Sequence, residues 1–260
     1  MRRFLALGTA GLWLVAWCVS GIARADELRV VTSGGLAAAF ASLAPDFERR
    51  TGHRVIVERG PSMGTTPNAV PQRLARGEPI DVVIMVGYAL GDLATAGKLV
   101  PGSRVDLARS LIGAAVRQGA PHADVSTVDG LKAALLAARS VAYSDSASGV
   151  YIEKELFKRL GIEERMAGKA RRVPAEPVGE VVARGDAELG FQQISELKPV
   201  HGLELLGPIP DEVQSVTIFS AGIVATSRHP AASRELIDFL ASPAATTAIG
   251  ESGMEPIVRK

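Results

Sequence analysis

Apolar and amphipathic stretches alternate along most of the chain, a pattern typical of strands and helices that follow one another. The first cycle predicts a strand at Leu28–Ser33, a helix with apolar residues at helical spacing over 36–47, and a second strand at Val55–Val57. A further helix is predicted to begin with Asn68 as its N-cap. The near-continuous apolar run Ile80–Val86 then indicates a parallel strand that is covered on both faces.

The alternation is interrupted at Val105–Val116, which reads as one long strand or crossing segment, and a second unit with the same pattern follows. The predicted elements of this unit are a helix at Thr127–Ala138, a strand at Ser140–Tyr143, a helix at Val150–Leu160, and strands at Leu189–Gln193 and Leu203–Leu206. The run Gln214–Thr226 would return the chain to the first unit, where two last helices lie at Ala231–Ala241 and Pro243–Ile249. We therefore predict an α/β protein with two lobes, each a doubly wound sheet with helices on both faces.

Lobe 1 is expected to be discontinuous in sequence, with lobe 2 inserted into it. Residues 26–108 and 225–260 would form lobe 1, and residues 109–224 would form lobe 2. The hinge would consist of the segments near 105–116 and 214–226, which cross between the lobes.

Residues 1–25 have the composition of a cleaved secretory signal peptide. Arg2 and Arg3 form a basic start, an apolar run continues to about Ile22, and the small-x-small site ends at Ala25. A membrane span is the alternative, since the apolar run approaches the length that one needs. We predict cleavage after Ala25, with export to the periplasm and 235 residues in the mature chain.

Cleavage would also change the chemistry of the chain. It would remove Cys18, the only cysteine, so the mature protein could form no disulfide and no cysteine metal site. Three of the 29 basic residues would be lost, which leaves 26 against 28 acidic ones. A nearly neutral chain gives no basis for binding nucleic acid or anionic lipid.

Four loops that lead into predicted helices are rich in small and hydroxyl residues. A helix N-terminus with free amides and hydroxyls is a receptor for anions, so these loops predict a site for a small anion between the lobes. The candidate ligand-binding residues in them are Ser33 and Gly34, then Ser62, Thr65, Thr66 and Asn68, then Ser146, Ser148 and Gly149, and finally Val178. Ordinary helix capping remains an alternative for the serines, because a cap and an anion ligand use similar geometry.

Other chemistry receives little support from the sequence. The four histidines are scattered without the spacing of metal ligands, so we predict no metal and no cofactor. Motifs of nucleotide-binding enzymes and of common hydrolases are missing from the sequence. Arg59 either faces the ligand or is a solvated charge at a strand end, and Asp81 is expected to be a structural hydrogen-bonding group.

The chain resembles the periplasmic molybdate-binding proteins of ABC importers, which have the type II solute-binding fold. The resemblance lies in the segments Val-Thr-Ser-Gly-Gly, Phe-Glu-Arg-Arg-Thr-Gly-His-Arg-Val, Leu-Ala-Arg-Gly-Glu-Pro-Ile-Asp-Val-Val-Ile and Ser-Gly-Val-Tyr-Ile-Glu-Lys-Glu-Leu. It implies that Ser33, the loop at 62–68, Ser148-Gly149 and Val178 bind the ligand. The tyrosine of that family corresponds to Phe191-Gln192-Gln193 here. This difference adds Gln192 to the candidates and, with Arg59, favours a di- or tricarboxylate over molybdate.

The Gly-Thr-Thr-Pro-Asn-Ala loop is also similar to the aconitate isomerase branch of the same fold. An isomerase that moves an allylic proton between cis- and trans-aconitate needs an acid and a base, and the candidates are Glu176, Tyr143 and Asp145. Three functions therefore remain open. The chain is a monomeric binding protein that delivers a small anion to an ABC permease, an aconitate isomerase, or a stand-alone sensor that passes its ligand to a membrane partner.

Overall fold

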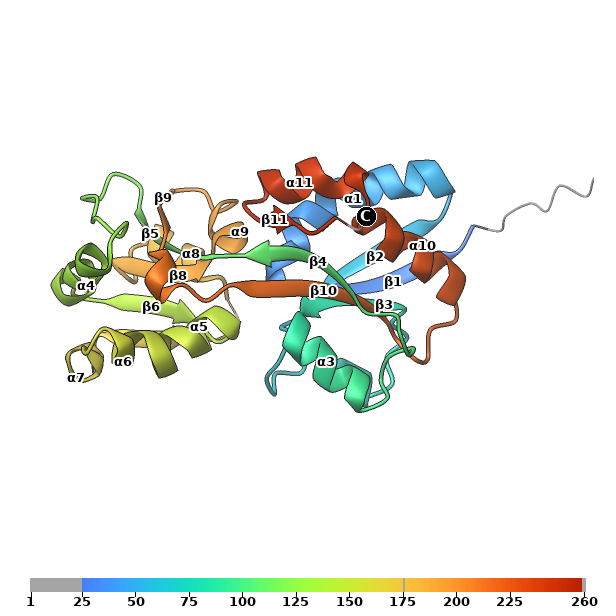
Figure 1. Cartoon of the computed structure of the whole chain (residues 1–260), viewed down its shortest axis with the longest axis horizontal. Coiled ribbons are helices and arrows are strands. Elements are labelled where there is room, and N and C mark those ends of the chain that lie inside the picture. Colours follow the sequence, from blue (N-terminus) through green and yellow to red (C-terminus); the bar gives the residue numbers. More distant parts are fainter. Residues whose placement is uncertain (1–24, 175, 259–260) are drawn as a thin grey trace, which may run out of the picture.

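The computed structural model describes residues 25–174 and 176–258, which form two lobes joined by two crossing segments of the chain (Figure 1). Each lobe is defined here as one β-sheet with the helices that cover it. The predicted signal peptide lies outside the described residues, except for Ala25 at its end. Within the described part of the chain, no helix is both long and apolar enough to cross a bilayer.

The sheet of lobe 1 has the strand order β11-β4-β10-β3-β1-β2. Its strands are β1 (Glu27–Thr32), β2 (Arg54–Arg59), β3 (Val82–Val86), β4 (Val105–Ser110), β10 (Thr217–Ile223) and β11 (Glu255–Pro256). Strand β1 pairs in parallel with both β2 and β3, whereas β10 and β4 are antiparallel to their neighbours. The sheet is therefore mixed.

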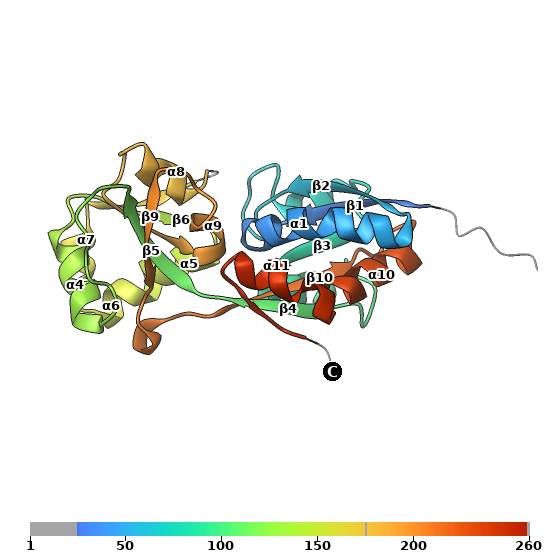
Figure 2. The ribbon, with the colours of Figure 1, turned by 90° about the horizontal axis from the view of Figure 1, so that it is seen from above.

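Helices cover both faces of this sheet, as Figures 1 and 2 show. On one face lie α1 (Gly34–Thr51), α10 (Pro230–Leu240), the 3₁₀ turn Pro243–Ala245 and α11 (Thr246–Glu251), and on the other lie α2 (Val70–Ala75) and α3 (Gly87–Thr95). Helix α1 forms as the periodicity predicts, since its buried residues include Leu36, Phe40 and Phe47. It ends at Gly52, whose φ of 77° is in the left-handed region that favours glycine.

The sheet of lobe 2 has the order β7-β6-β8-β5-β9 and is also mixed. Its strands are β5 (Ile112–Arg117), β6 (Val141–Ser144), β7 (Ala170–Val173), β8 (Leu189–Gln193) and β9 (Leu203–Pro208). Its helices are α4 (Val128–Ala137), α5 (Ala147–Tyr151), α6 (Phe157–Arg159), α7 (Glu163–Met166), α8 (Val178–Ala183) and α9 (Ile194–Leu197), with a 3₁₀ turn at Asp211–Val213. Buried apolar clusters pack on both faces of this sheet as well.

The α/β class and the cover of helices on both faces of each sheet are confirmed. Several details differ from the prediction. The segment 105–116 is two strands, because the chain leaves the first sheet after Ser110 and enters the second at Ile112. The predicted helix at Val150–Leu160 begins earlier, at Ala147, and contains a π-helical turn over Ile152–Leu156 between α5 and α6.

The second crossing lies within the expected hinge segment 214–226, but the lobe boundary comes earlier than predicted. Strand β10 pairs with β3 and β4, so the chain has already returned to lobe 1 at Thr217, whereas the sequence assigned residues up to 224 to lobe 2. Gln214 stands at this crossing, where its Oε1 accepts from the Ile112 amide at 2.9 Å and its Nε2 donates to the Ile112 and Ile209 carbonyls. The two crossing segments are thus tied to each other beside lobe 2.

The predicted N-cap of the second helix is wrong by one residue. Ala69 is at the N-cap of α2, with no side-chain capping bond, and Asn68 precedes it. The helix is held instead by backbone bonds, including Val70 N to the Pro61 carbonyl at 2.9 Å. A short helix fixed by its loop does not require a capping side chain, so the local capping rule fails here.

Candidate ligand-binding cleft

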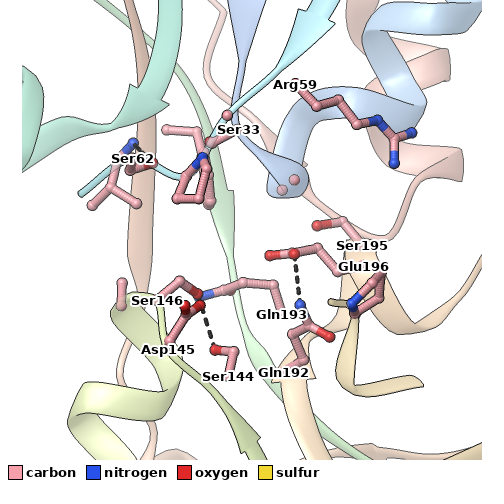
Figure 3. A pocket seen from close by; sticks show the side chains of 18 of the residues that line it. Ser33, Arg59, Ser62, Ser144, Asp145, Ser146, Gln192, Gln193, Ser195 and Glu196 are labelled. Carbon is pink, nitrogen blue, oxygen red and sulfur yellow. Dashed lines mark hydrogen bonds between the residues drawn. The ribbon is translucent and has the colours of Figure 1, made fainter. Parts of the chain in front are cut away.

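A cleft of about 220 Å³ lies between the lobes, where the strand ends of both sheets meet (Figure 3). Lobe 1 contributes the residues that follow β1 and β2 and the first turn of α1. Lobe 2 contributes the residues that follow β6 and β8 and the start of α8. This placement follows from topology, since ligand sites of α/β sheets form outside the carboxyl ends of parallel strands.

The structure brings most of the predicted residues together in this cleft. The lining residues among the ligand candidates are Ser33, Gly34, Arg59, Ser62, Asn68, Ser146 and Gln192, and among the catalytic candidates Asp145 and Glu176. The candidates that do not line it are Thr65, Thr66, Ser148, Gly149, Val178 and Tyr143. Loops that are far apart in sequence therefore converge, although only part of each loop faces the cavity.

The wall from lobe 1 is built around Ser33 and Ser62. Ser33 occupies the N-cap position of α1, but its side chain makes no capping hydrogen bond, and its buried Oγ has no partner among the described residues. Ser62 is also buried, and its Oγ accepts from the Val86 amide at 3.0 Å, which fixes the loop after β2 to the end of β3. Of these two hydroxyls, only that of Ser33 has no partner in the part of the chain that the structure describes.

The wall from lobe 2 uses several predicted ligand atoms internally. Ser148 is fully buried, and its Oγ lies 3.0 Å from Ser144 Oγ, which also lies 2.9 Å from Ser146 Oγ. Gly149 packs so tightly that an added Cβ would lie 1.6 Å from the Ser144 carbonyl oxygen. Ser148 and Gly149 therefore hold the end of β6 against α5 behind the cleft wall.

The Val178 amide, a predicted anion donor, is also already engaged. It donates to Gln192 Oε1 at 2.9 Å, so the Gln192 side chain takes the place of an N-cap for α8. Because Oε1 accepts this bond, the Gln192 amide nitrogen points the other way, into the cleft, where it donates to Glu196 Oε2 at 2.7 Å. Sequence reasoning could not assign this bond, because it joins residues 14 positions apart on two elements.

Glu196 is the main cleft residue that the sequence did not single out. It belongs to α9, a one-turn helix directly after β8, and it is half-buried. Burial raises the pKa of the Glu196 carboxyl to about 7; the Gln192 hydrogen bond and the positive charge of Arg59 lower it, and the charge of Asp145 raises it. The available signal was an acidic residue just beyond the end of a strand, the same placement that identified the other loops.

Two of the three predicted catalytic candidates lie in environments that suit them poorly. Tyr143 is buried in the core of lobe 2 against the Phe157 ring, with centroids 6.0 Å apart, and burial raises its pKa. Glu176 lines the cleft but forms two bonds of 2.9 Å to Arg184, which lower its pKa. Asp145 lines the cleft directly after β6.

Three buried polar atoms without partners among the described residues lie on residues that line this one cleft. They are Ser33 Oγ, Gln193 Oε1 and Ser195 Oγ. Buried polar atoms are normally hydrogen-bonded, so their concentration here indicates a surface that a polar ligand or water completes. Among the described residues, in the cleft or outside it, no group of three or more His, Cys, Asp or Glu side chains could hold a metal ion.

Over residues 28–255 the sequence matches the family of bacterial extracellular solute-binding proteins. The chain belongs to this family. Proteins of this family bind a small ligand and serve ABC-type importers. A cleft between two lobes agrees with such a role. Membership of the family also supports the predicted export from the cytoplasm.

Relatives of this solute-binding protein include both a molybdate-binding protein and an isomerase. It is 51% identical to an aconitate isomerase of Pseudomonas sp over 255 residues, which cover 98% of this chain and 97% of the relative. It is 27% identical to the molybdate-binding protein ModA of Azotobacter vinelandii, over 97% of this chain and 96% of the relative.

Solved structures support the same fold. The periplasmic molybdate-binding protein of Azotobacter vinelandii superposes with a TM-score of 0.71 at 22% identity, covering 90% of this chain and all of the other. The substrate-binding domain of a molybdenum ABC transporter from Clostridium difficile gives 0.67 at 18% identity, with the same coverage. At these identities the likeness shows the fold alone.

Proposed function

We propose that this solute-binding protein is an aconitate isomerase, which interconverts cis- and trans-aconitate in the cleft between its lobes. The observation that carries the proposal is the 51% identity to an aconitate isomerase over nearly the whole length of both chains. The 27% identity to a molybdate-binding protein is much lower over a similar span. The enzyme is thus favoured over the receptor.

The composition of the cleft supports a carboxylate as substrate. Arg59 lines it, and a guanidinium can bind a carboxylate through two parallel hydrogen bonds. The first turn of α1 and the Ser33 hydroxyl offer further donors, and an 18-residue helix directs a positive end toward them. These groups would bind a tricarboxylate at several points and hold the reacting carbons in place.

The reaction that the proposal requires is a proton transfer along an allylic system. A base removes a proton from the methylene carbon of aconitate, and the electron pair is delocalised over the allylic carbons and the adjoining carboxylates. A proton is then added at the other end of the allylic system, so the double bond moves and no oxidant is consumed. Donors that face the carboxylates would stabilise the charge that develops in this step.

A binding protein that delivers a di- or tricarboxylate to an ABC permease is the second candidate. Its support is the family itself, together with the cleft between the two lobes. Domain closure around a ligand is a motion of binding proteins with this organisation.

One assay separates the two candidates. The mature protein, residues 26–260, would be mixed with trans-aconitate, and formation of the cis isomer followed by proton NMR. We expect many turnovers per protein molecule. Saturable binding of aconitate in calorimetry with no cis product would reject the isomerase and favour the receptor, and molybdate would be titrated in parallel as the alternative ligand.

A further inference from the structure

Glu196 connects the two walls of the cleft. The residue belongs to α9 of lobe 2, yet its Oε2 approaches the first residue of α1 in lobe 1 so closely that a Cβ added to Gly34 would lie 2.3 Å from it. Figure 3 shows the carboxyl directed into the cavity, with its hydrogen bond to Gln192. Helix α9 is thus placed to present one carboxyl beside the positive end of α1.

The hydrogen bonds behind Glu196 fix its position. The Gln192 side-chain amide has an oxygen that accepts and a nitrogen that donates. Because the Val178 amide can only donate, it bonds to the oxygen, Oε1. The donor end is then committed to Glu196 Oε2 at 2.7 Å. Gly34 has no side chain, and this leaves the space that the carboxyl occupies.

We propose that Glu196 is the catalytic residue that moves the allylic proton, with Gln192 and Gly34 as positioning residues; this inference rests on the proposed isomerase. The Glu196 carboxylate removes a proton from the methylene carbon, so a C–H bond breaks and an O–H bond forms. The carboxyl then returns a proton to the other allylic carbon, so the O–H bond breaks and a new C–H bond forms. One group serves both steps, and the residue ends as it began.

The charges around Glu196 suit a group that must accept and release a proton. Arg59, Asp145 and Glu176 are the other charged residues that line the cleft, and Glu176 is paired with Arg184. On α9 and its C-terminal end, Lys198 Nζ donates instead to the Glu251 carbonyl oxygen at 2.6 Å. Burial brings the pKa of Glu196 to about 7, so both protonation states are populated near neutral pH.

The test compares Glu196→Gln with Glu164→Gln, an exposed position on α7 that lies outside the cleft. We expect Glu196→Gln to lower kcat by about 100- to 10,000-fold, the usual contribution of an acid–base group, and Glu164→Gln to leave it unchanged. Exchange of substrate methylene protons in D₂O, followed by NMR, should fall in parallel. Binding of propane-1,2,3-tricarboxylate, a saturated analogue, should stay within a few-fold of wild type in both variants, which shows that the site remains folded.

Gly34→Ala tests the geometry without touching the carboxyl. The added methyl group would displace the end of a flexible side chain and not backbone, so we expect the unfolding midpoint to be unchanged and kcat to fall at least tenfold.

Gln192→Leu removes a hydrogen bond that lowers the pKa of Glu196, so the ascending limb of the kcat/KM–pH profile should move to higher pH. A purely structural role for Gln192 would lower activity without moving that limb.

The outcomes distinguish the two proposals. If the wild type turns over aconitate and Glu196→Gln retains activity within about fivefold, another group moves the proton and this inference is rejected, while the isomerase stands. Asp145→Asn would then test another carboxyl that lines the cleft. If the wild type shows no turnover, both proposals are rejected.

Discussion

At the residue scale, the cleft is distinguished by polar side chains that are buried but are not fully used by the protein. Ser33, Gln193 and Ser195 each have a buried polar atom without a partner in the described chain. Ser148 and the Val178 amide were predicted from two of the loops that lead into helices, yet both are bonded within the protein. The sequence identified hydroxyls and amides near strand ends, and only side-chain packing separated those that face the cavity from those behind it.

Arg59 is expected to bind a substrate carboxylate. Arg59→Gln should weaken binding of propane-1,2,3-tricarboxylate by about 10- to 100-fold, because a hydrogen bond to a charged group contributes roughly 1.5–3 kcal/mol. Arg54→Gln, at the opposite end of the same strand, is the matched control and should change nothing. Calorimetric titration measures both, and equal affinities in the two variants would contradict a ligand role for Arg59.

Glu196 should make the stability of the protein depend on pH. A carboxyl whose pKa rises from 4.5 to about 7 on folding favours the folded state below pH 4.5, and this contribution is lost as pH rises through 7. Glu196→Gln, which cannot ionise, should therefore have a higher free energy of unfolding than wild type at pH 8, by at most about 3 kcal/mol, and a similar one at pH 4.5.

Urea denaturation at the two pH values measures this difference, with Glu164→Gln as a control that should show no such dependence. A gain that is the same at pH 4.5 and pH 8 would mean that packing, and not ionisation, accounts for it.

At the scale of single elements, the periodicity of the sequence was a good guide wherever an element packs on a broad apolar surface. Helix α1 and strand β3 formed as predicted, since one has an apolar face and the other is apolar throughout. Short elements were harder to predict, because their conformation depends on contacts with neighbouring elements more than on their own residues. Helices α7 and α9 have four residues each, and α9 was not predicted although it carries Glu196.

Close packing between α5 and β6 is expected to be sensitive to a single methyl group. Gly149→Ala would place a Cβ 1.6 Å from the Ser144 carbonyl oxygen, which is backbone and cannot rotate away, so we expect a loss of several kcal/mol of stability or failure to fold. Gly250→Ala, in α11, meets nothing within 4 Å and should be neutral or stabilising by up to about 1 kcal/mol. Thermal unfolding of both variants checks the pair, and similar midpoints would show that α5 can shift without cost.

At the scale of the whole molecule, two lobes with separate apolar cores share a cleft and are joined by two crossing segments. We expect the lobes to close when a tricarboxylate binds between them, since both walls supply donors. Small-angle X-ray scattering should give a smaller radius of gyration with saturating propane-1,2,3-tricarboxylate than without it. At a ligand concentration 100 times Kd, binding should also stabilise the fold by about 2.7 kcal/mol. Stabilisation without compaction would indicate a cleft that is already closed in the free protein.

The sequence by itself determined the α/β class, the alternation of strands and helices, and the loops that end near the cleft, because these depend on local periodicity and turn chemistry. Tertiary structure decided where the chain changes lobe, which hydroxyls were already bonded, and that Gln192 holds a carboxyl from the next helix. Those features depend on distances between residues that are remote in sequence or on different elements, and no local pattern records such distances.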